Sequence, residues 1–275
     1  MSAPQRRTEG RDTLPSPNAP DRPSLTLLGG GAARSLPRRS LSAEGKRKPQ
    51  RIQLTPRDVV IAQDLVRFYG LTAEQVARRH FTAGRTAANR LAELAAVGYV
   101  QLERPWYRGP GVYVATRLGA QLADVGLPAP PFRPLRMAHH LAVADLAEIL
   151  LRKYAHVEGI GWTCERTLHQ AAMAMVRDRT GGRLLAGVEH VPDGVLTTPS
   201  ARWAVEVELS KKGDAEYARI FRWYAAQLDY RRVAWYAAKE PVRRRLQVLV
   251  ERERLGDLMS VLPLPEGVRV YEWGR

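Results

Sequence analysis

The sequence has very little cysteine and no long apolar run. Its single cysteine, Cys164, cannot form a disulfide within the chain, and one cysteine beside six histidines does not make a Cys/His zinc cluster. No apolar stretch reaches the roughly 20 residues that cross a bilayer, and the first residues lack the apolar centre of a secretory signal. We therefore expect a cytoplasmic protein with no membrane partner.

Acidic residues are scarce relative to basic ones. The chain of 275 residues carries 43 Lys and Arg against 28 Asp and Glu, which gives a net charge of +15. Such an excess favours a polyanionic partner, and we expect double-stranded DNA. The alternative is that the arginines only cover a solvated surface. The hydrophobic fraction of 45% is enough to form a core, and the length suits one large domain or two ordinary ones.

Apolar residues are also scarce in the first 50 positions, which are rich in Pro, Ser, Gly and Arg. A segment of this composition cannot bury enough surface to offset the entropy lost on ordering. We predict a disordered basic tail over residues 1–50. It acts either as a solvated linker or as an arm that tethers the protein to DNA.

Helix signals begin directly after this tail. Thr55 and Thr72 each start a capping box, and Thr82 is placed to start a third helix. Gly70 and Gly98 are placed to end the first and third helices. Strand patterns at 99–102 and 112–114 follow, and then a short helix after Thr116. Three helices and a hairpin predict a winged helix-turn-helix domain over residues 51–126.

The third helix of such a domain usually reads the major groove, and the hairpin forms the wing. Arg and Asn side chains read guanine and adenine edges, while further arginines bind phosphates. The alternative is a winged helix that contacts protein rather than DNA. The candidate DNA-binding residues are Arg85, Thr86, Asn89 and Arg90 on the third helix, Arg78 and Arg79 before it, and Arg108 in the wing.

Four prolines between 127 and 134 predict a stiff linker over residues 127–135. The remainder, residues 136–275, alternates between helix and strand, which predicts an α/β sandwich and an α/β (α+β) fold class for the whole chain. The predicted helices cover 137–154, 214–228 and 242–253, and the predicted strands cover 159–165, 191–196, 203–209, 233–236 and 268–272.

One of these strands carries two acids. Glu206 and Glu208 are two positions apart, so their side chains share a face of what we predict to be a central strand. Asp193 lies just before a short hairpin that leads into this strand. Converging carboxylates are the oxygen ligands that Mg²⁺ or Mn²⁺ prefers, so the pattern predicts a site for one of these ions. The alternative is an edge strand with its polar face in water.

The segments Pro192-Asp193, Glu206-Val207-Glu208 and Lys211-Lys212 resemble the core of PD-(D/E)xK nucleases. The resemblance implies that Asp193 and Glu206 bind metal and that a lysine positions the attacking water. Glu208 occupies the position of that lysine, which leaves Lys211 or Lys212 to substitute from the following turn. The implied catalytic residues are Asp193, Glu206, Glu208 and Lys211.

From about residue 55 to the C-terminus, the chain is similar to the replication-relaxation family of bacterial plasmids and integrated mobile elements. The resemblance implies a role in replication, DNA relaxation or transfer, with other replication or transfer proteins as further partners. It also adds Glu165 as a third metal-binding acid beside Asp193 and Glu206. The matching segments are 71–75, 90–91, 98–100, 116–119, 140–145, 165–166, 192–193 and 205–208.

Two function classes remain open, and a transcriptional regulator is a further alternative. One is a DNA-binding protein whose nuclease-like domain is degenerate, which Glu208 in the lysine position favours. The other is an active Mg²⁺- or Mn²⁺-dependent endonuclease or nickase. The adjacent histidines His139 and His140 do not show the spacing of a relaxase metal cluster, and we expect them to lie on a helix. We expect Tyr217, Trp223, Tyr224 and Tyr230 to pack in a core.

Overall fold

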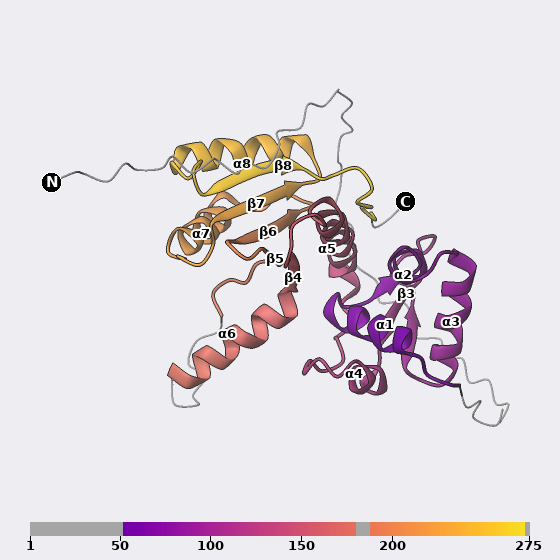
Figure 1. Ribbon diagram of the computed structural model, residues 1–275. Coiled ribbons are helices and arrows are strands. Elements are labelled where there is room, and N and C mark those ends of the chain that lie inside the picture. The colour runs from indigo at the N-terminus through magenta and orange to yellow at the C-terminus, as the bar shows by residue number, and fades with distance from the viewer. Residues whose placement is uncertain (1–51, 180–187, 273–275) are drawn as a thin grey trace. The chain divides into compact units, whose positions relative to one another are not determined.

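The computed structural model describes residues 52–179 and 188–272 (Figure 1). The predicted basic tail, residues 1–50, lies outside these ranges. Every helix within them is too short or too polar to span a lipid bilayer.

The first described elements are three helices whose starts are set by local capping. Helix α1 (Pro56–Arg67) follows a capping box at Thr55, and α2 (Ala73–His80) follows one at Thr72. Helix α3 (Gly84–Ala96) begins after Ala83, which forms no side-chain cap, so it starts slightly later than the position of Thr82 predicts. Gly70 and Gly98 take positive φ values of 121° and 84°, which turn the chain after α1 and α3.

A small antiparallel sheet completes this part. Its strands are β1 (Leu71–Thr72), β2 (Val100–Glu103) and β3 (Val112–Ala115), with β3 in the middle. Helix α4 (Arg117–Ala123) follows β3 and is capped by Thr116. Buried side chains from the helices and strands form one core, which includes Ile61, Leu65, Leu91, Leu94 and Val100.

The second sheet has five strands in sequential order (Figure 1). They are β4 (Gly161–Cys164), β5 (Gly194–Thr197), β6 (Arg202–Glu208), β7 (Arg232–Ala237) and β8 (Met259–Pro263). The pairs β4–β5 and β5–β6 are antiparallel, and β6–β7 and β7–β8 are parallel. Strand β6 is therefore central, as the sequence predicts.

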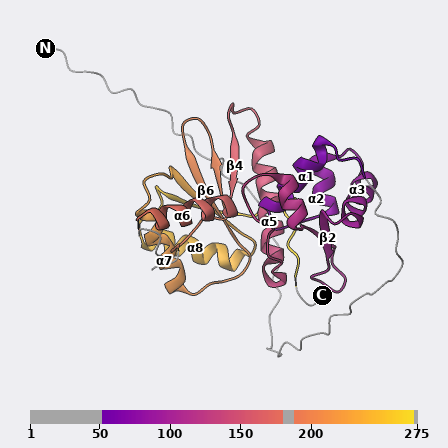
Figure 2. The same ribbon diagram turned by 90° about the horizontal axis from the view of Figure 1, so that it is seen from below.

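Helices cover both faces of this sheet. Helix α5 (Pro134–Lys153) lies on the face of Trp203, whose ring packs against Tyr154 at the end of α5 with 5.8 Å between centroids. The opposite face carries Ala204 and Trp235, which share a core with α7 (Asp214–Ala225) and α8 (Glu240–Arg252). Figure 2 shows α7 and α8 next to each other and apart from α5.

After α5, two elements differ from the sequence prediction. Helix α6 (Glu165–Arg179) follows β4 directly and was not expected. The predicted last strand at 268–272 is wrong, because β8 lies at Met259–Pro263. In the predicted region, Arg269 N donates a hydrogen bond to the Asp145 carboxylate rather than to a neighbouring strand, and Tyr271 packs against Trp106.

Candidate functional site

Strand β6 presents two buried acids on one face. Glu206 and Glu208 are only 4% and 3% exposed, and they share the face of Ala204, which packs against α7 and α8. Strand alternation predicts this shared face. Because an isolated buried charge is costly, these two carboxylates need positive charges or hydrogen-bond donors close to them.

Asp193 lies immediately before β5, which begins at Gly194 opposite Val205. Its two carboxylate oxygens accept hydrogen bonds from different groups: His139 Nε2 on α5 at 2.9 Å and the backbone nitrogen of Val207 at 2.7 Å. Burial would raise the pKa of Asp193, but the charge and hydrogen bond of His139 lower it overall. Asp193 is thus held from the α5 side, whereas Glu206 faces α7.

Glu206 is bound by two side chains at the same oxygen. His190 Nε2 lies 2.8 Å from its Oε1, and the Tyr224 hydroxyl donates to that atom too. Burial raises the pKa of Glu206, and the negative charge of Asp193 raises it further. The structure therefore brings Glu206 within electrostatic reach of Asp193, while separate partners hold the two carboxylates.

Glu208, which the sequence resemblance places at the lysine position of a nuclease motif, pairs with a lysine of this chain. The Lys212 amine donates to Glu208 Oε2. Burial alone would lower the pKa of Lys212, but the carboxylate of Glu208 raises it overall. Lys211 is exposed, and its charge acts on Asp214 at the start of α7. Of the two candidate lysines, only Lys212 reaches the acids of β6.

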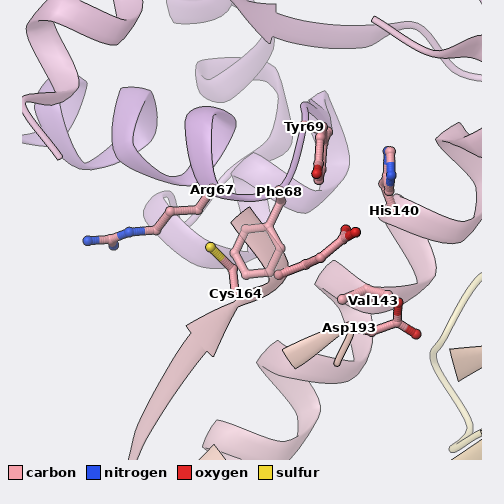
Figure 3. A pocket seen from close by; sticks show the side chains of 8 residues that line it. Arg67, Phe68, Tyr69, His140, Val143, Cys164 and Asp193 are labelled. Atoms are coloured by element: carbon pink, nitrogen blue, oxygen red, sulfur yellow. The ribbon is translucent and has the colours of Figure 1, made fainter. Parts of the chain in front are cut away.

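Glu165 begins α6 and lines a small pocket together with Asp193. Burial raises the pKa of Glu165, and the charge of Asp193 raises it further. Figure 3 shows Tyr69 and His140 with their rings face to face at this pocket; their centroids are 4.0 Å apart. Burial lowers the pKa of His140 to about 3, so this ring is neutral.

These residues do not fit a ligand set for Mg²⁺ or Mn²⁺. Both oxygens of Asp193 accept hydrogen bonds from protein donors, and Glu206 and Glu208 each already bind a basic side chain. Across residues 52–179 and 188–272, no group of three or more His, Cys, Asp or Glu side chains is arranged to hold an ion.

The candidate DNA-binding residues fall into two groups. Arg85, Thr86 and Asn89 are exposed on α3, and no residue in the described part of the chain forms an ion pair with Arg85. Arg108 is exposed in the turn between β2 and β3, where its guanidinium lies 5.7 Å from the ring centroid of Tyr107, which is 96% exposed. These side chains are accessible to a large partner.

The other three arginines are used within the chain. Arg90 pairs with the buried Asp58 at 2.6 Å, Arg78 pairs with Asp145, and Arg79 contacts Asp64 at 3.4 Å. Their charges are balanced by these carboxylates. The geometry therefore favours Arg85, Thr86, Asn89 and Arg108 over Arg78, Arg79 and Arg90 as DNA contacts.

Sequence reasoning missed the partners of the acids. His139 lies 54 positions from Asp193, and His190 and Tyr224 lie 16 and 18 positions from Glu206, so no spacing rule connects these residues to the carboxylates that they bind. Tyr224 was expected only to pack in the core; it is buried there, but its hydroxyl also binds Glu206. The helical position expected for His139 and His140 is confirmed by α5.

Comparison with known proteins gives one family. The family model described as Replication-relaxation matches residues 63–242, which run from α1 into α8. No curated protein gives a significant match.

Proposed function

Because the chain belongs to the replication-relaxation family, we propose that it binds duplex DNA during the replication, relaxation or transfer of a plasmid or other mobile element. The observation that carries the DNA-binding part is the exposed face of α3. Arg85, Thr86 and Asn89 lie there together, and none of them is buried in the core of the fold.

The order of elements around α3 supports this proposal. Helix α1, strand β1, helices α2 and α3, and the hairpin β2–β3 follow one another in the order of a winged helix. In such domains the recognition helix enters the major groove, and Arg and Asn side chains on it bind base edges. The exposed Tyr107 and Arg108 at the hairpin turn suit contacts to the sugar-phosphate backbone. The net charge of +15 adds a general attraction to polyanions.

The second sheet supports a domain that is related to nucleases. We propose that DNA cleavage is not its main function. Helix α5 is followed by the antiparallel strands β4, β5 and β6, then by α7 and the parallel strand β7. Apart from α6, which lies between β4 and β5, this is the element order of the PD-(D/E)xK core. Glu208 in the lysine position favours a degenerate site. The second candidate function is a Mg²⁺- or Mn²⁺-dependent endonuclease or nickase, and the match of Asp193 and Glu206 to the metal-binding positions of the nuclease motif favours it.

DNA binding is tested by selecting preferred duplexes from a random pool and measuring their affinity by fluorescence anisotropy. We expect Arg85→Ala to weaken binding to the selected duplex by about 1–3 kcal/mol, because a bidentate base contact is lost. Arg244→Ala, which removes the same charge from α8, is the matched control and should change affinity little. Binding that is unaffected by Arg85→Ala, or that does not weaken with added salt, contradicts the proposal.

The two candidates differ in their effect on supercoiled plasmid. If the protein binds DNA without cleaving it, supercoiled plasmid should stay supercoiled when Mg²⁺ or Mn²⁺ is added. Nicked product that disappears with Glu206→Ala would establish the endonuclease or nickase instead.

A further inference from the structure

We propose that three basic side chains of the chain itself, those of His139, His190 and Lys212, take the place of a divalent cation among the carboxylates beside β6. The inference concerns the second sheet alone. It goes beyond the proposed function and does not depend on whether the protein binds DNA.

Each of the three acids pairs with one basic side chain. His139 Nε2 lies 2.9 Å from Asp193, His190 Nε2 lies 2.8 Å from Glu206, and the Lys212 amine binds Glu208. Each base comes from a different segment: His139 from α5, His190 from the residues before β5, and Lys212 from the turn after β6. Three separate segments therefore converge on three acids.

The three acids are largely buried. The side chains of Asp193, Glu206 and Glu208 are 14%, 5% and 4% exposed, so water contributes little to stabilising their charges. Buried carboxylates require a compensating positive charge or hydrogen-bond donors. In metal sites of this kind the ion supplies that charge, whereas here the Lys212 amine and hydrogen bonds with the imidazoles of His139 and His190 stabilise the acids.

Neutral donors occupy further positions around the same acids. The backbone nitrogen of Val207 donates to Asp193 at 2.7 Å, and the Tyr224 hydroxyl donates to Glu206. An ion needs several ligand oxygens at about 2.0–2.6 Å. To gather them it would have to displace at least one of these protein donors, so the wild-type cluster should bind divalent ions weakly.

Removal of one base should therefore increase the affinity of the cluster for a divalent ion. Lys212 is the best position for this change, because its side chain is 30% exposed and methionine can replace its aliphatic part without opening a cavity. Lys212→Met leaves all three acids in place and removes the cation nearest to Glu208. The unbalanced negative charge then favours an added ion.

The experiment is a titration of the full chain with MnCl₂, in which free Mn²⁺ is followed by electron paramagnetic resonance. We expect Lys212→Met to bind one Mn²⁺ at least about tenfold more tightly than the wild type, a difference of about 1.4 kcal/mol. Lys211→Met, which removes the neighbouring exposed charge, is the matched control and should behave as the wild type. Circular dichroism establishes that each variant is folded.

Two results would overturn the inference. One is tight binding of a single Mn²⁺ by the wild type that Asp193→Asn abolishes, because the acids would then already form a metal site. The other is a Lys212→Met variant that binds Mn²⁺ no better than Lys211→Met. If Lys212→Met does not fold, His139→Gln can be titrated with Mn²⁺ in its place and should also bind the ion more tightly than the wild type. Glutamine keeps a hydrogen-bond donor near Asp193 but carries no charge.

Discussion

Asp58 is a buried carboxylate whose partners are all local to the first three helices. It accepts hydrogen bonds from the backbone nitrogen of Thr55 at 2.7 Å and from the Thr55 hydroxyl at 2.8 Å. Arg90 adds two more, from Nε at 2.8 Å and from a terminal nitrogen at 2.6 Å. Burial would raise the pKa of Asp58, but the bonds from Arg90 and Thr55 lower it overall.

A lowered pKa makes this acid a source of stability that depends on pH. The contribution is fully present above the unfolded-state pKa of about 3.9, and it is lost as the pH falls through the lower pKa of the folded state. We expect Asp58→Asn to lower the free energy of unfolding at pH 7 by about 1–3 kcal/mol. The difference from wild type should shrink below pH 4, as urea unfolding at both pH values would show.

The exposed Asp257 provides the control for this prediction. Asp257→Asn should leave the urea midpoint nearly unchanged at both pH values. A loss of stability in Asp58→Asn that is equal at pH 7 and at low pH would contradict an ionic role for Asp58.

At the same scale, the sequence identified the acids of the candidate site better than their partners. Strand alternation is a local rule, so it places Glu206 and Glu208 on one face from their spacing alone. The residues that bind these acids depend on which helix covers that face of the sheet. Tertiary packing determines this, and the local sequence does not show it. His139, for example, reaches Asp193 across 54 positions of sequence.

At the scale of elements, local chemistry predicted most starts and ends of helices. The capping boxes at Thr55 and Thr72 and the cap at Thr116 are all confirmed. Helix α6 was missed because few of its side chains are buried, and the sequence therefore lacks a regular apolar stripe. Strand β8 was missed because Met259–Pro263 contains a serine and ends in a proline, which weakens the strand pattern.

The pairing of β4 with β5 depends on one glycine. The Trp162 ring lies over Gly194, and a Cβ at position 194 would come within 1.9 Å of a ring carbon. Gly194→Ala should therefore force Trp162 to move and lower the free energy of unfolding by about 1–3 kcal/mol. Chemical denaturation followed by tryptophan fluorescence measures the effect.

Gly161 on β4 is the matched position, because a Cβ there meets no atom within 4 Å. Gly161→Ala should have a much smaller effect on the denaturation midpoint. If both alanine variants lose the same stability, the cost comes from the strand backbone and not from the contact with Trp162.

At the scale of the whole described chain, Asp145 connects three segments. This carboxylate on α5 is 2% exposed. It accepts hydrogen bonds from Gln75 Nε2 at 2.8 Å and from Arg78, both on α2, and from the backbone nitrogen of Arg269 at 3.1 Å. The buried charge thus satisfies donors from α2 and from the segment that follows β8.

Removing this charge should weaken all three connections together. We expect Asp145→Asn to lower the free energy of unfolding by about 3 kcal/mol, because Arg78 loses its most buried partner. The exposed Glu158 provides the control, and Glu158→Gln should leave stability unchanged. A variant Asp145→Asn as stable as wild type, by urea denaturation, would show that the other contacts of α2 are sufficient.

The hydrogen bonds to Asp145 also have a consequence for the order of events in folding. They join positions that are 67, 70 and 124 residues apart. Contacts this distant in sequence form only after large loops have closed, so we expect them to form after the folding transition state. Asp145→Asn should therefore leave the refolding rate nearly unchanged and speed up unfolding, on the order of 100-fold for a loss of about 3 kcal/mol. Asp145 would then determine how long the native state lasts once it has formed.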